Sequence, residues 1–148
     1  LDFDRPVATR EQLRDVNPQR FELEQLDGIV YVDRENHVVA GYKDVRPDEF
    51  WVRGHMPNYP LLPGVLMCEA SAQLVAFYFT TAGMKTGDFI AFGGMDNVRF
   101  RGAVRPGDRL VLVGTALRIN RGQTLFNGQG FAGRVPVSHR DVLGVPFQ

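Results

Sequence analysis

The stretch from Leu61 to Gly83 constrains this chain most, because it contains a single charged side chain, Glu69. Pro63 suits the first position of a helix, and Gly83 suits the residue just past a helix end. The sequence therefore predicts a helix over 63–81. Its apolar residues lie nearly all the way round the helix axis: Val65, Leu66, Met67, Ala70, Leu74, Val75 and Phe77. Such a helix is buried on all sides.

The same stretch is long enough to span a bilayer, which is the main alternative to a buried helix. Pro63 and Gly64 near its start, and Glu69 and Gln73 in its middle, argue against a span. A charge at mid-span is costly, and the rest of the chain is amphipathic. We therefore expect a helix wrapped by a sheet and no membrane span.

Strand-like runs separated by turn residues occupy most of the remaining chain. Before the long helix, a short helix around 11–15 ends at Pro18, and polar residues at 34–36 join two predicted strands. After it, Gly93-Gly94 marks a bend, and turns are predicted at 105–108 and 120–122. The predicted strands are 28–33, 37–44, 89–92, 95–100, 110–119, 123–130 and a weaker 135–145.

One buried helix followed by hairpin-connected strands is an α+β pattern. A curved antiparallel sheet around a central helix would satisfy it. With 148 residues, the chain is too short for two ordinary domains, so we expect a single domain over 1–148.

Charge and cysteine content restrict the partners and the compartment. Seventeen basic side chains balance seventeen acidic ones, so no overall field attracts nucleic acid. The sole cysteine, Cys68, has no intrachain disulfide partner and favours a reducing compartment such as the cytoplasm. The charged N-terminal residues do not resemble a signal peptide.

Glu69 is the sharpest chemical feature, because a carboxylate inside a buried helix must be paired, protonated or facing a cavity. Burial raises the pKa of a carboxyl group, which suits a general acid. Gln73 follows one helical turn later on the same face and could hold the carboxyl in place. Taken alone, Glu69 also fits a structural role beside an arginine.

His55 lies in a loop whose prolines bar a helix and predict a stiff, extended segment. An imidazole titrates near neutral pH and is a natural base. Downstream, Leu62-Pro63-Gly64-Val65 offers no side-chain cap, so the first amides of the helix are free to hold a developing oxyanion. A surface histidine and a water-capped helix start are the structural alternatives.

Other catalytic patterns are absent from the sequence. No Cys/His spacing suggests zinc, and there is no Gly-x-Ser-x-Gly elbow, P-loop or dinucleotide fingerprint. His37, in a turn, and His139, in a polar segment, fit structural roles better than catalytic ones.

The run from Gly54 to Gln73, GHMPNYPLLPGVLMCEASAQ, resembles the signature of the β-hydroxyacyl-acyl carrier protein dehydratases. That family has a GHFP-type loop, then PGVL, then a glutamate in an EAxAQ helix. Two further segments agree: 96–108, DNVRFRGAVRPGD, and the opening 18–21, PQRF. A sister group that also isomerises the double bond has aspartate at the Glu69 position, so Glu69 favours the plain dehydratase branch.

The resemblance implies a hotdog fold and reversible loss of water from a (3R)-hydroxyacyl thioester in fatty-acid or lipid A biosynthesis. In this interpretation His55 removes the α-proton, Glu69 protonates the departing hydroxyl, and the Gly64 amide holds the thioester oxygen, with Gln73 in support. It implies no metal and no redox cofactor. The alternatives on the same fold are a thioesterase and a non-catalytic acyl-binding protein.

The resemblance also implies partners. The substrate arrives on acyl carrier protein, for which Arg99 and Arg101 are the predicted docking residues. Two subunits join their sheets edge to edge, with His55 of one subunit facing Glu69 of the other, and three such dimers can assemble further. The acyl tail is expected along Leu61, Leu62, Val65 and Phe92.

Some residues depart from the family pattern. Gln19 replaces a histidine of the opening motif, and Ala103 replaces a proline. The tail Ser138-His139-Arg140-Asp141 is expected to interrupt the last strand. These departures bear on substrate range and docking rather than on the acid-base pair.

Overall fold

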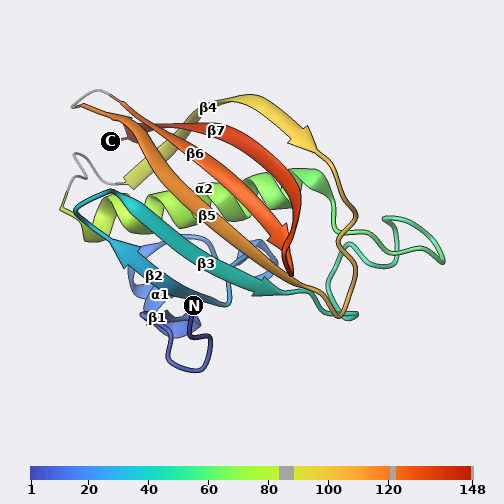
Figure 1. The fold of residues 1–148 in the computed structure, drawn as a ribbon. Coiled ribbons are helices and arrows are strands. Elements are labelled where there is room, and N and C mark those ends of the chain that lie inside the picture. The colour runs from blue at the N-terminus through green and yellow to red at the C-terminus, as the bar shows by residue number, and fades with distance from the viewer. Residues whose placement is uncertain (84–88, 121–122, 148) are drawn as a thin grey trace.

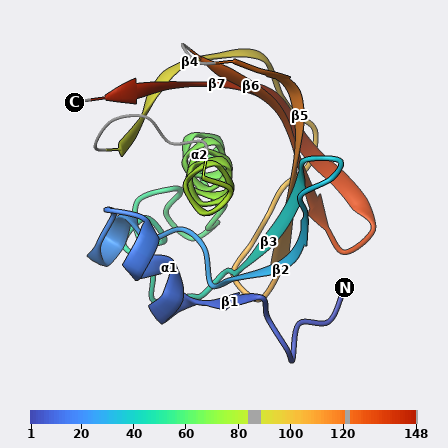
Figure 2. The same cartoon turned by 90° about the vertical axis from the view of Figure 1, so that its left-hand side faces the viewer.

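The structure, a computed structural model, describes residues 1–83, 89–120 and 123–147, with the backbone alone for 89–92 and 146–147. One long helix, α2 (Gly64–Thr81), lies along the concave face of a curved sheet (Figures 1 and 2). The sheet has seven strands in the order β1-β2-β3-β5-β6-β7-β4, all paired antiparallel. The predicted α+β arrangement is therefore confirmed.

The elements follow the predicted order closely. They are β1 (Ala8–Thr9), α1 (Arg10–Val16), the 3-10 helix η1 (Phe21–Leu23), β2 (Gly28–Asp33), β3 (Val38–Asp44), α2, β4 (Phe89–Phe100), β5 (Arg109–Ile119), β6 (Thr124–Ala132) and β7 (Val135–Phe147). Helix α1 begins with a capping box in which Thr9 and Gln12 exchange hydrogen bonds. Pro63 is the N-cap of α2 rather than its first residue.

The predicted bend at Gly93-Gly94 is a register shift inside one continuous strand, β4, and not a break between two strands. Within the described residues β4 pairs with β7 alone, which leaves its other edge open. Of the predicted turn Asn120-Arg121-Gly122, the last two residues lie outside the described part of the chain.

The core fills the space between α2 and the sheet. Leu74 and Tyr78 from the helix pack with Leu110, Leu112 and Phe126 from the strands, each at most 1% exposed. The helix comes close to the sheet at Gly41, where a Cβ atom would lie 3.0 Å from the Leu74 side chain. None of the helices in the described part of the chain is long and apolar enough to cross a bilayer.

The expectation that residues 138–141 interrupt the last strand was wrong. Strand β7 is continuous and pairs with β6 on one side and β4 on the other. The sequence misleads because Ser138 and Arg140 face the helix although both are polar. The guanidinium of Arg140 donates from its two terminal nitrogens to Ser71 Oγ and Ser138 Oγ inside the core, while its buried Nε has no partner among the described residues.

Candidate active site

His55 lies in the loop that joins β3 to α2, and this loop is turned rather than extended. Successive turns are closed by the bonds from the Val52 amide to the Glu49 carbonyl and from the His55 amide to the Trp51 carbonyl. A further turn over 56–59 places Pro57 second and Asn58, with φ of 63°, third. Proline favours that second position of a turn, which explains why the prediction of an extended loop was wrong.

The backbone selects one tautomer of the neutral His55 ring. Its Nδ1 lies 2.8 Å from the carbonyl oxygen of Leu61. Because a carbonyl oxygen can only accept, Nδ1 carries the proton. In neutral His55 the other nitrogen, Nε2, then has a free lone pair, and the exposed ring can present it to a substrate.

Glu69 projects from the second turn of α2 and is half-buried. Burial raises the pKa of its carboxyl group, and the hydrogen bond from Gln73 opposes this only in part. No ion pair involves Glu69 among the described residues, so the structural role beside an arginine is not found. A carboxyl group with a raised pKa and no cationic partner suits proton donation.

Gln73 cannot turn its side-chain amide around, because three hydrogen bonds fix it. Its Oε1 accepts the Gln25 amide at 3.0 Å, while its Nε2 donates to the Leu23 carbonyl at 2.6 Å and to Glu69 Oε2 at 3.0 Å. Asn17 Nδ2 donates to the main-chain carbonyl of Gln73 at 3.0 Å and ties the same segment to the helix backbone. Leu23 and Gln25 thus fix the side-chain amide that in turn fixes the Glu69 carboxyl.

At the start of α2 the amide of Gly64 is uncapped, and the ring of Phe100 packs over this residue. Pro63, the N-cap, makes no side-chain cap, and the amides of Leu66 and Met67 already turn back to the Pro63 carbonyl. The Gly64 amide precedes these and has no acceptor within the helix. A Cβ atom on residue 64 would lie 2.7 Å from the Phe100 ring. Only glycine therefore fits beneath Phe100 as it stands.

Phe100 is the residue of this site that the sequence did not identify. The residue is 48% exposed although its ring packs on the helix start. Its signal in the sequence is its position between Arg99 and Arg101, in the segment that resembles the family pattern. Both arginines are exposed, as docking residues must be.

The remaining predicted residues are spread over the surface and core. Val65 is 73% exposed and Leu61 half-exposed, whereas Leu62 is in the core. The side chain of Phe92 lies outside the described residues. Within the single described chain no hydrogen bond joins His55 to Glu69. His37 donates or accepts at 2.6 Å with the buried Tyr78 hydroxyl, which supports its structural assignment.

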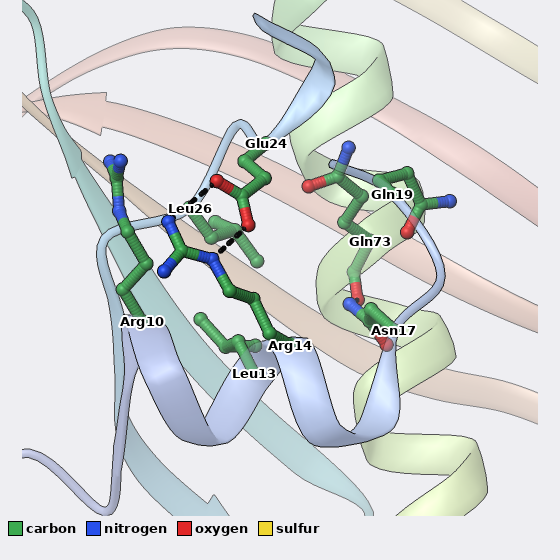
Figure 3. Close-up of a pocket in the computed structure, with 8 residues that line it drawn as sticks. All are labelled: Arg10, Leu13, Arg14, Asn17, Gln19, Glu24, Leu26 and Gln73. Carbon is green, nitrogen blue, oxygen red and sulfur yellow. Dashed lines mark hydrogen bonds and ion pairs between the residues drawn. The ribbon is translucent and has the colours of Figure 1, made fainter. Parts of the chain in front are cut away.

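A small cavity lies beside Gln73, between α1, the segment after it and α2 (Figure 3). An ion pair between Arg14 and Glu24 crosses its wall, and Gln19, which stands at the position of the family's histidine, also lines it. Neither His55 nor Glu69 borders this cavity. It belongs to the packing behind the site and does not hold the reacting groups.

The chain belongs to the FabA-like family, whose domain matches residues 17–137. A relative from Bacillus velezensis, named 3-hydroxyacyl-[acyl-carrier-protein] dehydratase FabZ, is 38% identical over 122 residues, or 82% of this chain and 84% of the relative. The protein of the same name from Acinetobacter baylyi is 35% identical over 120 residues, or 79% and 80% of the two chains.

Among solved structures, the chain is similar to one from the dehydratase heterocomplex ApeI:P of Xenorhabdus doucetiae. The TM-score is 0.76, with 15% sequence identity, over 92% of this chain and 91% of that one. At that identity the likeness concerns the fold alone, and it agrees with the hotdog fold expected from the sequence.

Proposed function

We propose that this chain catalyses the reversible dehydration of (3R)-hydroxyacyl thioesters, carried by acyl carrier protein, to trans-2-enoyl thioesters in fatty-acid or lipid A biosynthesis. The observation that carries the proposal is the state in which the surroundings hold the two side chains. The Leu61 carbonyl places the proton of neutral His55 on Nδ1 and leaves Nε2 as the acceptor, and burial raises the pKa of Glu69. Elimination of water needs one base and one acid of this kind.

In the proposed mechanism Nε2 of His55 removes the α-proton. The C–H electron pair forms the double bond while the bond from the β-carbon to the hydroxyl breaks. Glu69 gives its proton to the leaving oxygen, and water is released. The Gly64 amide at the positive end of α2 holds the thioester oxygen as negative charge develops on it. Gln73 keeps the Glu69 carboxyl aimed at the hydroxyl.

We further propose that the working unit is a dimer, in which His55 of one subunit faces Glu69 of the other, and that three dimers can assemble. The absence of an intrachain bond between these residues supports this arrangement, as does the open edge of β4. Exposed apolar side chains around the proposed site suit a subunit interface and an acyl tunnel: Phe21, Leu23, Met56, Tyr59, Val65 and Phe100. Arg99 and Arg101 remain the proposed contacts for acyl carrier protein.

The proposal is tested by hydration of a trans-2-enoyl thioester, followed by the loss of enoyl absorbance. We expect His55→Ala and Glu69→Gln each to lower kcat about a hundredfold or more, the usual contribution of one acid or base. His139→Ala is the matched control and should retain activity. Near-normal rates in folded His55→Ala and Glu69→Gln proteins would overturn the assignment, and release of free thiol by the unaltered protein would identify a thioesterase instead.

A further inference from the structure

The loop that carries His55 is tied to the sheet by an ion pair that is almost completely buried. Lys43 Nζ, on β3, lies 2.6 Å from Glu49 Oε1, and the two side chains are 3% and 7% exposed. Removing two charges from water is costly unless further hydrogen bonds satisfy them. The pair therefore calls for an explanation beyond simple packing.

Glu49 gathers further donors from the loop itself. Its Oε2 accepts the Arg46 amide at 2.7 Å, and its Oε1 accepts the indole Nε1 of Trp51 at 3.1 Å. Burial alone would raise the pKa of Glu49, but these donors and Lys43 outweigh it, so that the pKa is lowered and the carboxylate stays charged. One side chain thus joins the sheet, the start of the loop and a buried indole.

Trp51 carries this constraint to His55. Its indole is 5% exposed and belongs to the core. Its carbonyl accepts the amide of His55 at 2.8 Å and that of Gly54 at 3.2 Å. The path from the sheet to the proposed base therefore consists of three hydrogen-bonded residues: Lys43, Glu49 and Trp51.

The far side of the loop is bonded to His55 directly, because the Leu61 amide donates to the His55 carbonyl at 2.9 Å. The Leu62 amide donates to the Val104 carbonyl at 2.8 Å, which places the Leu61 carbonyl that orients the imidazole ring. The ring keeps its bond to Leu61 only if the His55 backbone stays in place. The Trp51 carbonyl accepts the His55 amide and so positions that backbone. The hydrogen bond from the Trp51 indole to Glu49 in turn fixes the orientation of Trp51, which an apolar contact would not do.

We propose that Glu49 is a positioning residue for His55, acting through the indole N–H of Trp51 to hold the imidazole in its Nδ1-protonated form. This inference rests on the proposed function, which makes His55 the base. The acceptor on residue 49, rather than its charge, is the essential feature. A base displaced by a fraction of an ångström loses rate while substrate binding is retained.

Two double variants separate the acceptor from the charge. Lys43→Met with Glu49→Gln removes both charges but keeps an oxygen for the indole, whereas Lys43→Met with Glu49→Leu removes the oxygen as well. Neither leaves an unpaired buried charge, which the single Glu49 variants would do. Trp51→Phe removes the indole N–H together with part of the buried ring system and tests the same bond from its other end.

We expect Lys43→Met/Glu49→Leu and Trp51→Phe each to lower kcat about tenfold with little change in KM, and Lys43→Met/Glu49→Gln to stay near the unaltered protein. Equal kcat values for the two double variants would overturn the proposal. The second readout is the ¹⁵N spectrum of the histidine rings, with the His55 signals identified by their loss in His55→Ala. In the unaltered protein this spectrum should show the Nδ1-protonated tautomer of His55. A mixture of tautomers is expected only in the variants that lose the acceptor oxygen of residue 49 or the indole N–H of Trp51.

The ring spectrum does not depend on turnover, so the two proposals can fail separately. If the unaltered protein does not hydrate enoyl thioesters but the His55 ring form follows the acceptor, the positioning role stands and the proposed function falls. If the protein is active and the ring form and kcat are the same in all three variants, the positioning role falls.

Discussion

At the scale of single residues, Glu69 and Gln73 show how the orientation and the pKa of a half-buried carboxyl group are set. The amide that donates to the Glu69 carboxyl is itself fixed by Leu23 and Gln25, so it cannot rotate to present its oxygen. The hydrogen bond orients the carboxyl group, while burial keeps the pKa raised. Orientation and acidity thus come from different neighbours.

The raised pKa of Glu69 predicts a pH-dependent stability. A group whose pKa is higher in the folded than in the unfolded protein stabilises the fold below the unfolded value, near 4.5 for glutamate, and loses that contribution as the pH rises through the folded value. Glu69→Gln removes the titration and should still accept from Gln73. We expect the variant to gain stability over the unaltered protein at pH 7–8 and to lose this advantage near pH 4.

Urea denaturation at several pH values measures the difference. A stability difference that did not change between pH 4 and pH 8 would show that the Glu69 carboxyl has an ordinary pKa when folded. The comparison needs no activity and is independent of the proposed reaction.

The sequence predicted the identity of the candidate site residues. It did not predict their protons or their hydrogen-bond partners. His55, Gly64, Glu69 and Gln73 could be identified because the chemistry needs those residue types near a helix start. The proton on Nδ1 of His55 could not be predicted, since it depends on a backbone carbonyl six residues away. Likewise the Lys43–Glu49 pair is formed only when the loop folds back on β3.

At the scale of elements, a single added methyl group at the start of α2 is expected to change function. Gly64→Ala should displace the Phe100 ring, whose atoms now lie where the methyl group would be. The displaced ring and the methyl group would crowd the Gly64 amide. We expect kcat for enoyl thioester hydration to fall at least tenfold, because one oxyanion donor is obstructed.

Stability should change little in the same variant, since alanine favours a helix over glycine by roughly 0.5–1 kcal/mol and Phe100 can move toward solvent. Thermal unfolding and kinetics on the same protein separate the two effects. Phe100→Ala in combination with Gly64→Ala is the control, because it removes the clash and should recover part of the lost activity. Full activity in Gly64→Ala alone would exclude the oxyanion role of this amide.

Strand β7 presents the opposite case, a continuous strand with buried polar residues where an interruption was expected. Arg140 is fully buried, and among the described residues no carboxylate pairs with it. Its pKa is lowered by burial, only partly opposed by Cys68. We expect Arg140→Met to raise the free energy of unfolding by about 1 kcal/mol, since it removes a buried charge without leaving a partner charge behind.

Chemical denaturation of Arg140→Met checks this expectation, with Arg101→Met as the control for removing an exposed arginine. A lower unfolding free energy in Arg140→Met would show that the bonds to Ser71 and Ser138 outweigh the burial of the charge. The strand pattern alone could not predict this buried arginine, because the hydroxyl groups that accept from it come from α2 and from β7 itself.

At the scale of the whole molecule, the predicted wrapping of a sheet around a helix followed from the one apolar helix and the alternating strands. The strand order did not follow from the sequence, because β4 lies beside the last strand rather than its sequence neighbours. That placement puts an open edge next to the proposed site, where a second subunit can pair.

Mixing two inactive variants tests whether His55 and Glu69 meet across subunits. In a mixed dimer of His55→Ala and Glu69→Gln, one site would lose both groups and the other would keep both. Random assembly of equal amounts should restore about a quarter of the unaltered activity, because half of the dimers are mixed and each has one intact site. Activity no higher than that of the separate variants, after exchange of subunits is shown by mass, would place both groups in one chain or exclude the pairing.

The hydrogen bonds of Gln73 have a consequence for transplantation. Helix α2 contains both Glu69 and Gln73, so residues 63–81 alone would seem sufficient to transfer the acid to another protein scaffold. Yet the amide is oriented by the carbonyl of Leu23 and the N–H of Gln25, which precede the helix by two strands and a long loop. A graft of residues 63–81 would carry the acid but not its orientation. The portable unit of this fold is the helix together with the turn at 21–25.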